Sequence, residues 1–170
     1  MDGSRSDDGV YSIDRIRAFL IEIGYGHRKL GAFRTYEFKS GQILTGGFSP
    51  PINVKFRQDV VVLGLIGQVV SGFQGGGTLS ADDVTYALTE MRLQFGSNED
   101  AFDDGYGTGL SSPFLQLFGR GRRADYPFDK PRFAKANIRY TATFYNFTPY
   151  TIQPTSSVRT IELLPEHEGP

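Results

Sequence analysis

The sequence predicts an all-β protein in which antiparallel sheets pack face to face. The clearest observation is alternation within Asn137–Thr148, where Ile138, Tyr140, Ala142 and Phe144 occupy every second position. A period of two indicates a strand with one buried face. Composition agrees, because 21 Gly and 9 Pro supply many turns while 14 Phe and 9 Tyr supply large apolar side chains, with no Trp. Short strands separated by frequent turns are typical of β-sandwiches.

The chain closes with a second strand after a turn. Asn146–Pro154 contains two prolines and several polar residues, which predicts that the chain reverses there. Ser156–Leu164 then returns as a strand, with Ile161 and Leu163 facing inward. We expect these two closing strands to belong to a sandwich and not to an active site.

The N-terminal segment has two interpretations that the sequence leaves open. Residues 1–11 are polar and acidic, and we expect them to form an arm. Ser12 is a candidate helix cap, and Ile13–Ile23 has the apolar spacing of a helix that ends at Gly24. The last part of this stretch also alternates, so a strand fits the pattern as well.

The middle of the chain predicts a series of strands. Val60–Ile66 is a continuous apolar run, which indicates a strand buried on both faces. Val84–Phe95 is the longest strand candidate, and its apolar parity switches at Thr89–Glu90, as a β-bulge would cause. Pro113–Phe118 fits either a helical turn or a short strand. Further extended segments are expected at Ala32–Lys39, Gln42–Thr45 and Ile52–Phe56.

Together these segments predict a jelly-roll-like antiparallel β-sandwich of about seven or eight strands, with no sustained helix after residue 24. A chain of 170 residues is long enough for one substantial core. We divide it into an N-terminal arm and first element (1–40), a β-sandwich domain (41–164) and a C-terminal tail (165–170).

Composition argues against several functions. With 18 basic and 19 acidic residues, no strong field favours nucleic acid or a membrane surface. The absence of Cys excludes disulfides, thiolate metal sites and a cysteine nucleophile. The two histidines, His27 and His167, are far apart in the sequence, so we do not expect a histidine metal site. No apolar run approaches the roughly 20 residues that span a bilayer, and the N-terminus lacks the features of a signal peptide. We therefore expect no membrane partner.

Two loops have a chemical interpretation beside a structural one. Gly72–Thr78 is glycine-rich like a phosphate loop, but it lacks the lysine and the following helix that such loops have. Gly96–Ser112 contains Glu99, Asp100, Asp103 and Asp104, which could supply oxygen ligands to calcium without matching an EF-hand. We interpret the first as a hairpin tip and the second as a solvated acidic loop. We expect no enzyme activity, no cofactor and no bound metal.

Basic and aromatic residues are interleaved between Arg120 and Lys135. Such a mixture can hold single-stranded nucleic acid, but in a chain of neutral net charge we favour contact with an acidic protein surface. From polarity and position, we predict that a protein interface includes Tyr11, Ile13, Ile16, Phe19, Arg120, Arg122, Arg123, Tyr145, Phe147 and Tyr150.

The order of features between about Gln42 and Leu164 carries a resemblance. Alternating and buried strands lead to a glycine-rich hairpin at Gly75–Gly77, then to Pro113–Gly119, a strand that ends in Asn146 and a last strand, Val158–Leu164. In this order the chain resembles the small jelly-roll virion proteins of tailed bacteriophages.

The resemblance implies a non-enzymatic structural protein of the virion, such as a capsid cement or decoration protein or a minor capsid protein. Its partners would be the major capsid protein or head–tail components, and it would form a homo-oligomer, a trimer or a pentamer, without binding nucleic acid. The alternative function is a carbohydrate-binding β-sandwich module. The candidates for its exposed aromatic residues are Tyr145, Phe147 and Tyr150, although Trp, often prominent in such modules, is absent.

Overall fold

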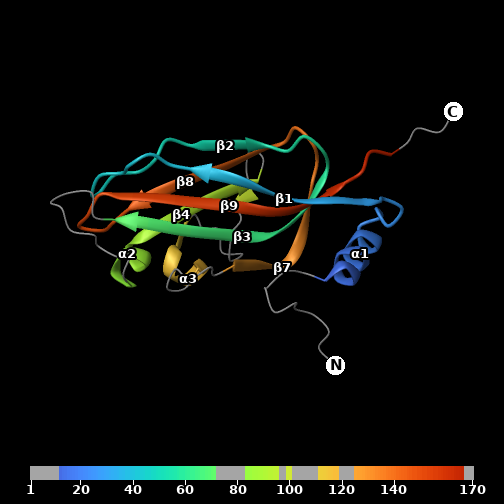
Figure 1. The fold of residues 1–170 in the computed structure, drawn as a ribbon, viewed down its shortest axis with the longest axis horizontal. Coiled ribbons are helices and arrows are strands. Elements are labelled where there is room, and N and C mark those ends of the chain that lie inside the picture. The colour runs from blue at the N-terminus through green and yellow to red at the C-terminus, as the bar shows by residue number, and fades with distance from the viewer. Residues whose placement is uncertain (1–11, 72–82, 96–98, 101–110, 119–124, 167–170) are drawn as a thin grey trace, which may run out of the picture.

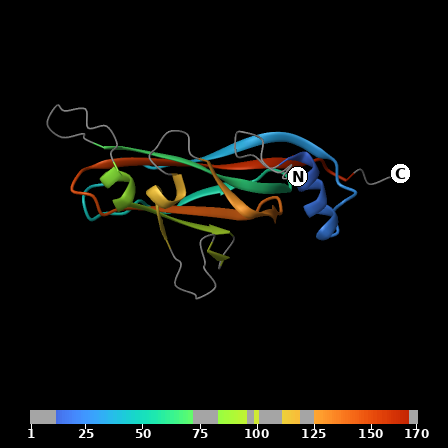
Figure 2. The same cartoon turned by 90° about the horizontal axis from the view of Figure 1, so that it is seen from below.

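The computed structural model is a sandwich of two antiparallel β-sheets (Figures 1 and 2). It describes residues 12–71, 83–95, 99–100, 111–118 and 125–166. The strands in this part of the chain are β1 (Leu30–Lys39), β2 (Ile52–Lys55), β3 (Val60–Ser71), β4 (Thr89–Phe95), β5 (Glu99–Asp100), β6 (Ser112–Pro113), β7 (Asp125–Ala134), β8 (Arg139–Asn146) and β9 (Ile152–Leu163). One sheet has the order β1-β9-β3-β7, and the other has the order β2-β8-β4-β5, with β6 also paired to β4. The prediction of an all-β sandwich is confirmed.

The N-terminal segment is a helix, α1 (Ile13–Glu22). The Ser12 side chain accepts a hydrogen bond from the Arg15 N–H at 3.3 Å and so caps the first turn. At the other end, Gly24 has a φ of 85°, the Gly24 N–H donates to the Ile21 carbonyl and the Tyr25 N–H donates to the Leu20 carbonyl. This is a Schellman ending, which needs a residue with positive φ and therefore favours glycine. Of the two interpretations, helix is correct.

Helix α1 covers part of one outer face of the sandwich. Its Ile16 and Leu20 are fully buried against apolar side chains of β3 and β9, namely Val61, Leu63, Ile161 and Leu163. Because the opposite face of β3 lies in the core between the sheets, the prediction that Val60–Ile66 is buried on both faces is confirmed for Val60 to Leu65. Ile161 and Leu163 are buried as expected, but they face α1 and not the other sheet.

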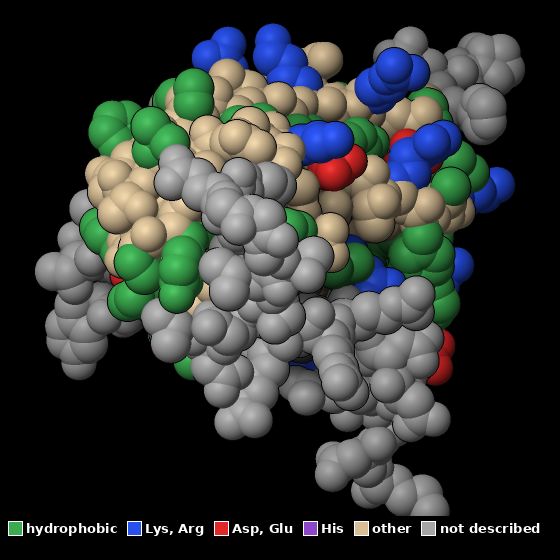
Figure 3. All heavy atoms as spheres, turned by 60° about the vertical axis from the view of Figure 1, so that its left-hand side comes forward, with side chains coloured by type: hydrophobic (Ala, Val, Ile, Leu, Met, Phe, Trp, Pro, Cys, Tyr) green, Lys and Arg blue, Asp and Glu red, His purple; other side chains and the backbone are tan. Residues whose placement is uncertain are grey.

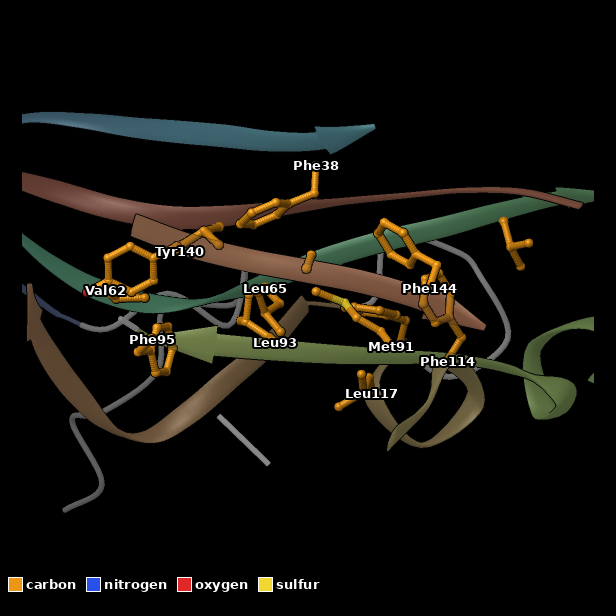
Figure 4. Close-up of a cluster of buried hydrophobic side chains, with 14 of the residues drawn as sticks. Phe38, Val62, Leu65, Met91, Leu93, Phe95, Phe114, Leu117, Tyr140 and Phe144 are labelled. Carbon is orange, nitrogen blue, oxygen red and sulfur yellow. The ribbon is translucent and has the colours of Figure 1, made fainter. Parts of the chain in front are cut away.

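The main core lies between the two sheets and is rich in aromatic rings (Figure 4). Tyr140, Ala142 and Phe144 of β8 point into it, as the alternation predicted, whereas Ile138 lies just before the strand and is exposed. A short helix, α3 (Phe114–Phe118), inserts the Phe118 ring against β3. A Cβ at Gly67 would lie 2.3 Å from that ring, so the close approach requires glycine there.

Two segments in the middle of the chain combine a helix with a strand. The predicted strand Val84–Phe95 is wrong in its first half, since Asp83–Leu88 is a helix, α2, and β4 begins at Thr89. The parity switch marks this helix–strand junction and not a bulge. The physical reason is that a helix of six residues is too short to show its period of 3.6. Pro113–Phe118 contains both alternatives, because β6 ends at Pro113 and α3 follows.

The last turn is shorter than predicted, because β9 already begins at Ile152. Pro154 lies within β9, where its carbonyl accepts a hydrogen bond from the Ser40 N–H at 3.4 Å. β1 pairs with β9, so the sandwich already begins before residue 41. The glycine-rich motif at 72–78 and most of the acidic loop at 96–112 lie outside the described residues.

Candidate interaction surface

Three aromatic side chains form a group on the outer face of β8, here called the aromatic surface: the exposed Phe48 and Phe147 and the half-buried Tyr145. The ring centroids of Phe48 and Tyr145 are 6.4 Å apart. Those of Tyr145 and Phe147 are also 6.4 Å apart, with the two ring planes only 9° from parallel. Phe48 is 70% exposed and Phe147 is 56% exposed, which is unusual for side chains of this size.

The strand period explains why these rings face outward. In β8, Tyr140, Ala142, Phe144 and Asn146 are buried at every second position, so Tyr145 lies on the opposite face of the strand. Phe48 is placed beside Tyr145 by an antiparallel bridge between the two residues. Phe147 follows at the end of the strand, where its N–H donates to the Leu88 carbonyl at 2.9 Å.

Aliphatic side chains extend this region. Leu88, at the end of α2, is 38% exposed, and Leu44, in the loop before Phe48, is 67% exposed. Figure 3 turns the α2 end of the molecule toward the viewer and shows hydrophobic side chains grouped on it. A grouped apolar surface of this kind marks a site of interaction more often than scattered single residues do.

A buried polar network holds the backbone beneath the aromatic surface. Asn146 is fully buried, and its Nδ2 donates to the carbonyls of Ile43 at 2.9 Å and Tyr150 at 2.7 Å. Its Oδ1 accepts from the N–H of Thr148 at 2.8 Å and from the Thr148 hydroxyl at 2.6 Å. The amide thus uses both N–H donors and both lone pairs of its oxygen. One side chain therefore ties the loop before Phe48 to the turn that carries Phe147.

Backbone hydrogen bonds fix the same loop from its other side. The Gly46 N–H donates to the Asn146 carbonyl, and the Asn146 N–H donates to the Gly47 carbonyl, both at 2.9 Å. Gly46 has a φ of 75°, a conformation that favours glycine. Beyond Phe48, the Ser49 hydroxyl accepts from the Phe144 N–H at 3.0 Å. The exposed rings therefore stand on ordered backbone, which reduces the entropy that a partner must remove on binding.

The structure brings together two of the predicted interface residues, Tyr145 and Phe147. Tyr150 lies nearby in the turn, half-buried, and contributes its carbonyl to the Asn146 network. The residues predicted on α1 lie at the opposite end of the sandwich (Figure 1). There Ile13 is 43% exposed, Phe19 is partly buried and Ile16 is fully buried inside the chain, so Ile16 offers no surface to a partner. Tyr11, Arg120, Arg122 and Arg123 lie outside the described residues.

Phe48 is the member of the surface that the sequence did not predict. It stands in a loop with no periodic neighbours, and only its pairing with Tyr145 places it beside the other two rings. A large apolar residue between Gly47 and Ser49 was the sole local signal.

The described part of the chain contains one contact between a histidine and a carboxylate. His27 Nε2 lies 2.7 Å from Glu166 Oε1, and both side chains are more than half exposed. Within the described residues, no group of three or more His, Asp or Glu side chains is placed to hold a metal ion. Nor does any described helix have the length and apolar character needed to cross a membrane.

Comparison with known proteins finds no protein family whose pattern matches the chain and no curated protein with significant sequence similarity.

Proposed function

We propose that this chain is a non-enzymatic structural protein of a bacteriophage particle, a capsid cement or decoration protein or a minor capsid protein that binds neighbouring virion subunits. The observation that carries the proposal is the strand order of the two sheets, β1-β9-β3-β7 and β2-β8-β4-β5. This order supports a finer assignment of the sandwich as a jelly roll.

A jelly roll interleaves its strands in a particular way, so that the first strand pairs with the last and the second pairs with the next to last. Here β1 pairs with β9, and β2 pairs with β8. The short strands β5 and β6 both pair with β4 and together take the place of one strand. Viral capsid proteins and lectins are two groups built on this fold, and the order of sequence features favours the first of them.

The aromatic surface supplies a contact suited to assembly. Aromatic residues are enriched in protein interfaces and carry a large share of the binding energy there. Phe48, Tyr145 and Phe147 present such residues on ordered backbone, at the end of the sandwich opposite α1. Subunits that associate through one surface usually close into a symmetric oligomer, which fits a trimer or a pentamer.

The protein composition of purified phage particles from the source of this gene tests the proposal. The chain should be present in a fixed ratio to the major capsid protein, measured by mass spectrometry after gradient purification. The double variant Phe48→Ser/Phe147→Ser should be lost from the particles, whereas Phe33→Ser, which changes an aromatic side chain 55% exposed on β1, should be retained. Absence of the unaltered chain from purified particles would contradict the proposal.

The second candidate function is carbohydrate binding, and one observation favours it. The rings of Tyr145 and Phe147 are stacked 9° from parallel at the surface, and a sugar ring could pack against such a pair. A glycan array separates the two functions. Binding of a defined glycan that is lost in Tyr145→Ala would favour the carbohydrate-binding module, and a blank array would favour the structural protein.

A further inference from the structure

A pocket of about 470 Å³ opens at the end of the sandwich away from the aromatic surface. It lies between the two sheets, where the end of β4 and the start of β8 face the end of β7. The described residues that line it are Phe95, Arg132, Phe133, Ala134, Lys135, Ile138 and Tyr140. Its volume falls within the roughly 300–1,000 Å³ of sites that bind small molecules.

The aromatic walls of this pocket are fixed by their neighbours. Tyr140 contacts the ring of Phe95 edge-on, with the centroids 4.9 Å apart, and it lies 4.4 Å from the ring of Phe56 in the core. Figure 4 shows Phe95 and Tyr140 together at one end of the buried cluster. Phe133 lies on the other face of β7, where its ring stacks on Tyr25 in the cluster under α1 with the centroids 4.4 Å apart. The rings of Phe95 and Tyr140 are therefore held in place before any ligand arrives and give the pocket an apolar wall.

Two of the residues that line the pocket are cationic, and none of its described lining residues is acidic. The Arg132 guanidinium carbon lies 4.8 Å from the centroid of the Phe95 ring. Stacking of this kind uses the flat face of the guanidinium, whose N–H groups lie at its edge and suit a planar anion. Lys135 adds an exposed ammonium at the rim.

The turn that carries Lys135 and Ile138 is held in place by Asp59. One carboxylate oxygen of Asp59 accepts from the Ala136 N–H at 2.8 Å, and the other accepts from Arg28 at 3.0 Å. The Asn137 N–H donates to the Phe56 carbonyl at 2.9 Å, and Asn137 has a φ of 66°. Asp59 is thus occupied by structural hydrogen bonds, and the rim of the pocket is set before any ligand arrives.

We propose that this pocket binds an organic anion with a flat apolar body, such as an aromatic carboxylate. The carboxylate would lie at Arg132 and Lys135, and the ring would lie against Phe95, Ile138 and Tyr140. A carboxylate held by a guanidinium forms charge-assisted hydrogen bonds, which are about twice as strong as neutral ones. This site is separate from the aromatic surface, and the inference does not depend on the proposed function.

Titration of the full chain with 2-naphthoate, followed by calorimetry and by backbone amide NMR, tests the inference. We expect saturable binding with the largest shifts at Lys135, Ile138 and Tyr140. Neutral 2-naphthalenemethanol and inorganic phosphate should each bind with an affinity at least about tenfold lower than that of naphthoate. The alcohol lacks the negative charge, and phosphate lacks the apolar ring. An oligothymidine is the fourth probe, since rings beside cations also suit single-stranded nucleic acid.

Matched variants locate the binding. Arg132→Gln and Lys135→Gln should each weaken naphthoate binding about fivefold or more, on the scale of a charge-assisted hydrogen bond. Arg139→Gln removes an exposed cation of β8 that does not line the pocket, and it should leave binding unchanged. Circular dichroism and urea unfolding of each variant confirm that it is folded.

Four results would overturn the inference: no saturation by naphthoate up to its solubility, equal binding of the neutral alcohol, variants in the pocket that bind as the wild type does, or tighter binding of oligothymidine than of naphthoate. Loss of naphthoate binding in Phe48→Ser/Phe147→Ser would also overturn it, since the probe would then occupy the aromatic surface.

Discussion

The two outer faces of the sandwich both carry apolar residues, but only one of the faces is covered by a helix in the described part of the chain. On the β3–β9 face, Val61, Leu63, Ile161 and Leu163 are at most 4% exposed, because α1 covers them. On the β8 face, Phe48 and Phe147 stay more than half exposed. The first face is stabilised by side-chain packing, whereas the second stands on the hydrogen bonds around Asn146. Exposure at the aromatic surface is therefore compatible with a well-ordered backbone, as the proposed role of this surface requires.

We expect truncation of a side chain to destabilise the protein strongly on the covered face and only slightly on the exposed one. Leu20→Ala leaves a cavity under α1 and should lower the free energy of unfolding by about 2–4 kcal/mol. Ile21→Ala, at a position 69% exposed on the same helix, should change it by less than about 0.5 kcal/mol. Phe147→Ser should change the free energy of unfolding as little as Ile21→Ala does. Urea unfolding measures all three, and a loss for Phe147→Ser as large as that for Leu20→Ala would end the distinction between the faces.

Asn146 is the position where the uncovered face should be sensitive. Asn146→Ala leaves the buried carbonyls of Ile43 and Tyr150 without this donor and should cost about 2–3 kcal/mol in the free energy of unfolding. Asn53→Ala is the control, because Asn53 lies exposed on the same sheet and accepts one hydrogen bond from Thr141. Its effect should stay below about 0.5 kcal/mol. Equal losses for the two variants, measured by urea unfolding, would show that the network does not hold this face.

An ion pair between Arg28 and Asp59 lies beside the covered face, and its contribution to stability should depend on pH. Arg28, just after α1, donates to Asp59 and to the Leu164 carbonyl and is itself buried. Partial burial acts to raise the pKa of Asp59, but the hydrogen bonds from Ala136 and Arg28, with the charges of Arg28 and Lys135, outweigh it and lower the pKa. A lowered folded pKa means that the carboxylate stabilises the fold above its unfolded pKa of about 4.

Asp59→Asn should therefore reduce the free energy of unfolding by about 1–2 kcal/mol at pH 7. This difference from the wild type should narrow as the pH falls below about 4, because the wild-type carboxylate then becomes protonated. Urea unfolding between pH 7 and pH 2.5 measures the difference, with Glu37→Gln on the exposed face of β1 as the control. A difference that stays constant over this range would contradict the role of the charged carboxylate.

The smallest loss of stability is expected for two glycines, one beside the covered face and one beside the aromatic surface. Gly24 ends α1 with a φ of 85°, and Gly46 lies in the loop before Phe48 with a φ of 75°. Alanine at either position should cost about 1 kcal/mol through backbone strain alone, since no neighbouring atom lies within 4 Å of the added methyl group. Gly41→Ala is the matched control, because an added methyl group at Gly41 also has open space around it but the residue has no positive φ. Thermal unfolding should show no loss for Gly41→Ala, and a comparable loss there would contradict the assignment to strain.

Local patterns predicted much of the fold. The alternation in β8 and the apolar run of β3 each indicate burial by themselves, and both predictions hold. The choice between helix and strand for the N-terminal segment could not be made, because its apolar residues fit both periods. Only the folded structure shows that β3 and β9 have an apolar outer face against which a helix can pack. Helix α2 was missed because its six residues alternate as a strand would.

The candidate site was only partly predictable for a related reason. Tyr145 and Phe147 could be found from their position around the last turn. Phe48 could not, because it joins them through a bridge between distant parts of the chain. The role of Asn146 depends on contacts with Ile43 and Tyr150 that exist only in the folded chain.

We propose that the aromatic surface is an assembly contact, and the mass of the protein in solution is the measurement that tests this proposal. Multi-angle light scattering over a range of concentrations would compare the wild type, Phe48→Ser/Phe147→Ser and the control Phe33→Ser. We expect a closed oligomer for the wild type and for Phe33→Ser, and a smaller species for the double variant. A wild type that stays monomeric at every concentration, or a double variant with the wild-type mass, would contradict it.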